Sequence, residues 1–163
     1  MATLKNPYAA LLGGLPPNEV ITDTPKRIAE LLARLGPAGL ERSYAPGKWT
    51  AREIVCHLAD TEIAFAFRLR QTVSEPHHII QPFDQDAWAK NYRSIPASAA
   101  AATFSAIRNW NLAFMEAVGP EARSKPVTHP ERGDMTFQTI LETMAGHDRN
   151  HLRQLETIAA QST

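Results

Sequence analysis

The sequence lacks features that are typical of disulfide-rich, nucleic-acid-binding and membrane proteins. Among its 163 residues there is one cysteine, Cys56, which excludes a framework of internal disulfides and favours a reducing compartment. Lysine plus arginine and aspartate plus glutamate number 17 each, so no basic excess points to nucleic acid. No uncharged apolar run approaches the ~20 residues of a membrane helix, and the first residues lack the apolar core of a secretory leader. We therefore expect a cytoplasmic protein with neither a nucleic-acid nor a membrane partner.

Four segments instead show the three- and four-residue apolar spacing of an amphipathic helix. Thr24 and Pro25 predict the start of the first, and Thr50 and Glu53 form the S/T-x-x-E capping box that begins the second. No segment alternates long enough to predict a strand, and residues 126–134 are turn formers that predict a loop. The sequence predicts an all-α four-helix bundle in a single domain spanning 1–163, with helices at 23–37, 47–76, 97–120 and 136–160.

Three of the six histidines occupy positions where a helix would bury leucine. His147 and His151 are four residues apart, so they stack on the apolar face of the last helix, and His57 lies at the edge of the second helix's apolar face. Separately hydrogen-bonded core histidines are the simpler interpretation, although each unsatisfied ring costs about 1–3 kcal/mol. A shared divalent cation satisfies one nitrogen of all three rings and leaves positions open for water or substrate. The other histidines, which fall in loops, are expected to be solvated: His77, His78 and His129.

The depth of these histidines along the helices predicts the topology of the bundle. His57 lies two turns into the second helix, whereas His147 and His151 lie two to three turns from the end of the fourth. At about 1.5 Å per residue these levels coincide only if the two helices are antiparallel. Residues 77–96 form a connection long enough to cross the bundle and to carry a short helix. The predicted order is therefore up-down-down-up.

Several polar residues near these positions are candidates for catalysis. Asp60 follows His57 by nearly one turn, so it either orients a ring or an arginine, or is an ordinary surface carboxylate. Asn111 lies on the inward face of the third helix and either bonds a histidine or ligand, or is a buried structural amide. Asp148 faces inward, and pairing with a nearby arginine is its simplest role. Cys56 is interpreted as a packing residue.

Substrate contacts are expected from the short helix of the long connection. Asp84, Trp88 and Tyr92 are spaced i, i+4 and i+8, which places them on one face. Aromatic side chains with a polar group are typical of a small-molecule pocket, although simple packing over the bundle end also explains Trp88.

Three stretches also carry a family resemblance: "GKWTAREIVCHLADTE", "QPFDQDAWA" and "HDRNHLRQLE". In these stretches the chain resembles the DinB-like superfamily, and within it the YfiT-like branch of metal-dependent hydrolases. The resemblance implies one divalent ion per chain, nickel or zinc, held by His57, His147 and His151, and it implies a homodimer. It also implies that a low-molecular-weight thiol can be a cosubstrate, because some relatives are S-transferases of the bacillithiol type.

The sequence therefore favours a metal-dependent enzyme acting on a small molecule, either by hydrolysis or by thiol transfer. A bound cation would supply hydroxide at neutral pH in the first case and hold a thiolate in the second. A non-catalytic metal- or ligand-binding helical dimer is the alternative from another class.

Overall fold

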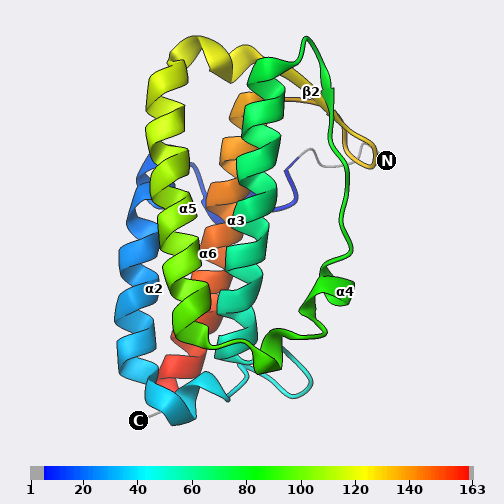
Figure 1. Ribbon diagram of the computed structural model, residues 1–163. Helices are drawn as coiled ribbons and strands as arrows, with labels where there is room; N and C mark the ends of the chain where they lie inside the picture. The colour runs from blue at the N-terminus through cyan, green and yellow to red at the C-terminus, as the bar shows by residue number, and fades with distance from the viewer. Residues whose placement is uncertain (1–5, 162–163) are drawn as a thin grey trace.

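The computed structural model describes residues 6–161, and four long helices dominate it (Figure 1). Short helical turns and three short strands join them. In chain order the elements are α1 (Ala9–Leu12), α2 (Pro17–Leu40), α3 (Ala51–Ser74), β1 (His78–Ile79), α4 (Gln85–Ala89), η1 (Tyr92–Ser94), α5 (Ala97–Val118), η2 (Pro120–Ser124), β2 (Pro126–His129), β3 (Gly133–Thr136) and α6 (Phe137–Ala160).

The bundle has the predicted up-down-down-up order. Figure 1 shows α3 and α5 running in one direction and α2 and α6 in the other, with the segment 75–96 descending along the outside of the bundle. That segment carries α4 and returns the chain to the end where α3 began. The long connection is thus what makes α3 and α5 parallel neighbours. Within residues 6–161, no helix combines the length and the apolarity needed to cross a membrane.

The helix starts follow local hydrogen bonding. The predicted capping box is confirmed, because the Glu53 amide donates to Thr50 Oγ1 and the Thr50 amide donates to Glu53 Oε2. The prediction that the first helix starts at Thr24 and Pro25 is wrong: α2 begins at Pro17 and contains Pro25. The predicted end of that helix, at residue 37, is close to a break in α2. The backbone leaves the helical conformation at Gly36, whose φ is 60°.

The chain also contains three short strands that the sequence does not predict. Strand β1 pairs in parallel with β2, and β2 pairs antiparallel with β3, so the expected loop 126–134 is mostly a hairpin. Strands of two to four residues are too short for alternation to be visible in the sequence. This small sheet buries His78 and His129, which corrects the expectation that both are solvated.

The apolar core is divided into two clusters along the bundle axis. One is rich in residues near the α3 amino terminus and the α6 carboxyl terminus, such as Ile54 and Ile158. The other joins the opposite half of the bundle to the sheet and includes Leu69 and Val127. Between the two clusters the helices bury polar side chains, which we call the polar layer: Thr24, His57, Thr61, Glu62, Arg108, Asn111, His147, Asp148 and His151.

Candidate metal centre

Three histidine rings meet in the polar layer. His57 comes from α3, and His147 and His151 come from successive turns of α6. His147 Nε2 lies 2.9 Å from His57 Nε2 and 3.1 Å from His151 Nε2. One potential ligand atom from each residue lies within 4.8 Å of the others, and all three side chains are buried. The structure therefore brings together the three histidines that the sequence predicted.

These distances suit a shared cation. Two nitrogens bound to one ion at roughly 2.0–2.1 Å and about 90–110° apart are about 2.9–3.4 Å from each other. A single hydrogen on His147 Nε2 cannot serve both neighbouring nitrogens at full strength, whereas a cation interacts with all three lone pairs. The donor set, three imidazoles with no carboxylate, fits zinc or nickel.

The tautomer of one ring is fixed by a neighbour. His151 Nδ1 lies 2.8 Å from Gln154 Oε1, so Nδ1 carries the hydrogen and Nε2 keeps a lone pair. Within residues 6–161 no hydrogen-bond partner meets the buried Nδ1 atoms of His57 and His147. Those two rings are oriented by aromatic packing instead: Trp49 lies 4.7 Å from His57, and Tyr8 lies 5.4 Å from His147, centroid to centroid.

Burial keeps these imidazoles neutral, which is the state that metal binding requires. Burial, together with His151, lowers the pKa of His57 to about 3. Burial also lowers the pKa of His151 to about 4, and the Gln154 hydrogen bond opposes this only in part. The pKa of His147 falls well below its usual value because its ring is buried and lies beside the other two.

A glycine on α6 makes room for the N-terminal segment. A Cβ at Gly146 would lie 2.6 Å from Tyr8 Cβ and 2.7 Å from the Tyr8 carbonyl oxygen. Arg149 Nε donates to the Leu11 carbonyl oxygen at 2.6 Å and holds the same segment on the helix. Gly146 thus allows the Tyr8 ring to contact the face of α6 that carries His147.

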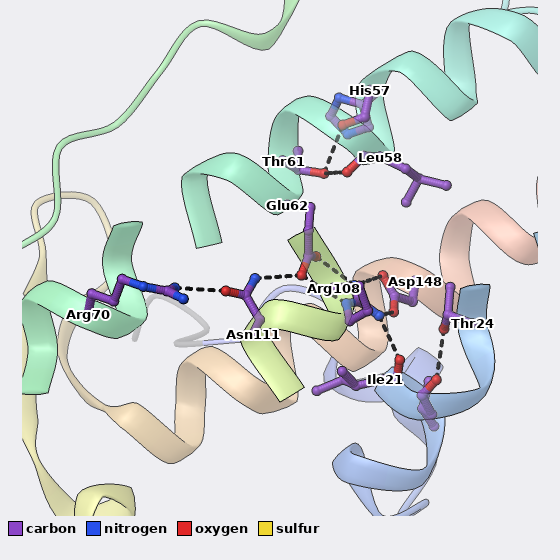
Figure 2. Close-up of polar contacts among 11 residues, drawn as sticks. Ile21, Thr24, His57, Leu58, Thr61, Glu62, Arg70, Arg108, Asn111 and Asp148 are labelled. Carbon is purple, nitrogen blue, oxygen red and sulfur yellow. Dashed lines mark hydrogen bonds and ion pairs between the residues drawn. The ribbon is translucent and has the colours of Figure 1, made fainter. Parts of the chain in front are cut away.

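An arginine with no solvent contact lies in the same layer (Figure 2). Arg108 of α5 donates to both oxygens of Glu62 on α3 and to both oxygens of Asp148 on α6. Its Nη1 also donates to the Ile21 carbonyl oxygen of α2 at 2.9 Å. All five N–H groups are therefore satisfied, and one side chain connects the four long helices.

The two carboxylate partners of Arg108 stabilise its positive charge. Burial works against the guanidinium charge, yet Asp148 and Glu62 raise the pKa of Arg108 above its usual range. Burial raises the pKa of Asp148, and Arg108 opposes that rise. Arg108 is not among the residues predicted from the sequence, although its spacing from Phe104 places it on the buried face of α5. The sequence predicts Arg68, Arg149 or Arg153 as the partner of Asp148, and this is wrong. The partner is Arg108, which comes from α5.

Asn111 extends this network away from the histidines. Its Nδ2 donates to Glu62 Oε1 at 2.7 Å, and its Oδ1 accepts from Arg70 Nη1 at 2.8 Å (Figure 2). The amide therefore has polar side-chain partners and contacts no histidine. Of the two interpretations offered by the sequence, the buried structural amide agrees with this placement.

Asp60 also lies apart from the histidine rings. Its Oδ2 accepts a hydrogen bond from the Tyr92 hydroxyl at 2.7 Å, and both residues line a cavity that contains no histidine. Burial and the Asp60 hydrogen bond raise the pKa of Tyr92, so the phenol keeps its proton. Burial raises the pKa of the Cys56 thiol to about 11, which agrees with a packing role.

The three predicted substrate residues do not share one face of a helix. Asp84 caps α4 by accepting hydrogen bonds from the amides of Asp86 and Ala87, and Trp88 stacks on Phe83 with centroids 4.5 Å apart. Helix α4 ends at Ala89, so Tyr92 falls in η1 and its side chain is buried. From the connection, Phe83 and Gln85 instead line the cavity that also includes His57 and His147 in its lining.

Two cavities reach the histidines from different sides. The first, about 170 Å³, includes His57 and His147 in its lining, and the second, about 350 Å³, includes His57 and His151. Tyr8 and Gln85 border both. A small molecule therefore has access to the converging nitrogens although the rings themselves are buried.

Comparison with known proteins agrees with this site. The family model of the DinB superfamily matches residues 21–155, which include all three histidines. A protein of Oceanobacillus iheyensis named "Putative metal-dependent hydrolase" is 25% identical over 139 residues, covering 85% of this chain and 81% of the relative. A protein of the same name from Bacillus mycoides is 23% identical over 139 residues, covering 85% of this chain and 80% of that relative.

A solved structure shares the fold. YfiT from Bacillus subtilis, described as "a probable metal-dependent hydrolase with an unusual four-helix bundle topology", superposes with a TM-score of 0.83. The match covers 90% of this chain and 85% of YfiT at 20% sequence identity. The arrangement of the helices is therefore the same in the two proteins.

Proposed function

Because this chain belongs to the DinB superfamily, we propose that it is a metal-dependent hydrolase acting on a small molecule. The observation that carries the proposal is the convergence of three histidine nitrogens beside two cavities. The names of the relatives support hydrolysis as the reaction class.

In this proposal His57, His147 and His151 hold one divalent ion, which supplies Lewis acidity and lowers the pKa of a bound water when present. Gln154 keeps Nε2 of His151 available by accepting the hydrogen on Nδ1. Trp49 and Tyr8 pack against the rings and limit their rotation.

Metal content is the first test. Elemental analysis of the purified protein should find close to one nickel or zinc ion per chain, and His147→Ala should lose most of it. His77→Ala is the matched control, because His77 is exposed and lies outside the site. Equal metal content in wild type and His147→Ala would overturn the metal site.

The reaction is the second test. The zinc- or nickel-loaded protein should hydrolyse members of a panel of small esters and amides, and a chelator should abolish the activity. Each assay is run with and without a low-molecular-weight thiol. Turnover only with thiol would replace hydrolysis by S-transfer, and full occupancy with no turnover in either series would favour a metal-binding protein.

The oligomeric state belongs to the same proposal. We propose that the protein acts as a homodimer, as the family resemblance implies. Light scattering coupled to size exclusion, performed with and without metal, should give twice the 18.0 kDa chain mass. A mass of one chain at micromolar concentration would contradict it.

A further inference from the structure

The smaller cavity is lined by two arginines as well as by histidines. Arg68 of α3 and Arg132 of the turn between β2 and β3 both line it, together with His129. Figure 1 shows the hairpin and the long connection on the side of the bundle where α3 lies. The lining comes from the N-terminal segment, α3, the long connection, the hairpin and α6, and both α3 and the hairpin contribute a guanidinium.

Neither arginine has an acidic partner within residues 6–161. Arg68 Nη2 donates to the Gln81 carbonyl oxygen at 3.4 Å, which is a weak contact. The Arg68 guanidinium otherwise lies 5.9 Å from the Phe65 ring centroid and 5.6 Å from that of Phe83. No ion pair joins Arg132 to a carboxylate in the part of the chain that is described.

Arg68, which is partly exposed, differs from the buried Arg108 in its hydrogen bonding. Every N–H group of Arg108 donates to a carboxylate or to a backbone carbonyl. Most N–H groups of Arg68 have no protein acceptor. The Arg68 guanidinium lies within cation–π distance of the Phe65 and Phe83 rings, and this interaction uses none of its N–H groups. Arg68 thus lies beside two aromatic rings with most of its hydrogen-bond donors available.

The charged residues that line the cavity give it a net positive charge. Burial and the neighbouring Arg132 lower the pKa of Arg68 to about 10, so the side chain remains charged at neutral pH. Burial and the same arginines lower the pKa of His129, which keeps that ring neutral. Glu131 is the carboxylate in the lining, and it is exposed to solvent. Two cations and one exposed anion make the wall attractive to a negative group.

We propose that Arg68 and Arg132 bind the carboxylate or phosphate group of a small anionic substrate while its apolar part packs on Phe65, Pro82 and Phe83. The proposal deepens the hydrolase function and rests on it, because the same cavity includes His57 and His147 in its lining. A planar guanidinium with open donors is suited to bidentate recognition of an oxyanion. The substrate class is therefore an acid whose scissile bond lies toward the histidines and whose charged end lies toward the hairpin.

Binding to metal-free protein tests this inference without relying on activity. Calorimetry is performed on chelator-treated, full-length protein with three probes: benzoate, its neutral isostere benzamide, and inorganic phosphate. Removing the ion prevents the probes from binding through a metal. The variants are Arg68→Gln, Arg132→Gln and, as the control, Arg34→Gln on the exposed side of α2.

Benzoate, phosphate or both should bind wild type and Arg34→Gln, and benzamide should bind at least about tenfold more weakly. Arg68→Gln and Arg132→Gln should each weaken anion binding by about tenfold or more, because a hydrogen bond to a charged group is lost. Circular dichroism confirms folding, and Arg132→Gln keeps the test valid if Arg68→Gln unfolds. The preferred probe distinguishes carboxylates from phosphate esters.

Equal binding of benzoate and benzamide, absence of binding by either anion, or wild-type affinity in both variants would each overturn the anion site. The metal test remains separate. A protein that binds anions but loses no metal in His147→Ala would keep the arginine site and disprove the proposed hydrolase centre.

Discussion

The Ile21 carbonyl oxygen and the Arg108 guanidinium form a hydrogen bond of 2.9 Å between α2 and α5. In a regular helix the Ile21 carbonyl would accept from the amide of the residue four positions later. That residue is Pro25, which has no amide hydrogen. The proline that was expected to start the helix instead frees an acceptor inside it, and a buried arginine from another helix uses that acceptor.

Arg108→Met should be among the most destabilising single substitutions in this chain. It leaves the buried carboxylates of Glu62 and Asp148 without their cation, and breaking such pairs typically costs about 3–5 kcal/mol. Urea denaturation should show this loss, while Arg34→Met on the surface changes stability by less than about 0.5 kcal/mol. Adding Glu62→Gln and Asp148→Asn should recover part of the loss; no recovery would contradict the charge explanation.

Gly146→Ala should destabilise the protein although alanine is the better helix former. At an unconstrained helical position the change would stabilise by about 1 kcal/mol, but here the new Cβ meets Tyr8 backbone at 2.7 Å. Overpacking of this kind costs about 1–3 kcal/mol, and hydrogen exchange in α1 should accelerate. An alanine variant more stable than wild type would show that the Tyr8 contact is absent in solution.

The metal-free protein should lose stability as the pH falls. The folded-state pKa values of His57 and His151 are lowered to about 3 and about 4, so between about pH 6.5 and pH 4 the unfolded chain binds more protons than the folded one. Stability therefore rises with pH across that window and is lost on acidification through it. Urea midpoints at pH 7.0, 5.5 and 4.5 measure the slope. His57→Gln should flatten it and His77→Gln should not; equal slopes in the two variants would refute this origin.

Tyr92→Phe should lower stability without affecting the metal site. The change removes the hydroxyl that donates to Asp60 Oδ2, a hydrogen bond worth about 1 kcal/mol. Thermal melts should record that loss, and metal content per chain should match wild type. Asp60→Asn is the companion variant, and a fall in its metal content would restore the sequence-based role of Asp60 beside His57.

Sequence reasoning identified the bundle and its histidines because both follow from helical periodicity. The register of His57 against His147 and His151 even predicted the topology, since only antiparallel α3 and α6 align them. It could not find Arg108, because a single arginine on an alanine-rich helix looks like a surface residue until its partners on other helices are known. The pairing of Arg68 with Arg132 in one cavity could not be predicted either, because the hairpin brings Arg132 there. The hairpin belongs to a sheet whose strands of two to four residues leave no periodic signal.

The common helical face predicted for the three substrate residues is absent for a related reason. Asp84, Trp88 and Tyr92 have helical spacing, but α4 stops at Ala89 and the chain turns before Tyr92. The tertiary position of Phe83 and Gln85, one residue on either side of Asp84, decides which side chains border the cavity. Spacing alone cannot distinguish the two sides of so short a helix.

The polar layer between the two apolar clusters has a consequence for how the helices align. If α6 slid by one turn, about 5.4 Å, the charge of Asp148 would enter an apolar cluster and leave Arg108 behind. Two uniformly apolar faces would tolerate such a shift with little loss. A central band of charge therefore permits one longitudinal alignment, and that alignment is the one in which histidines from two helices stand at the same height.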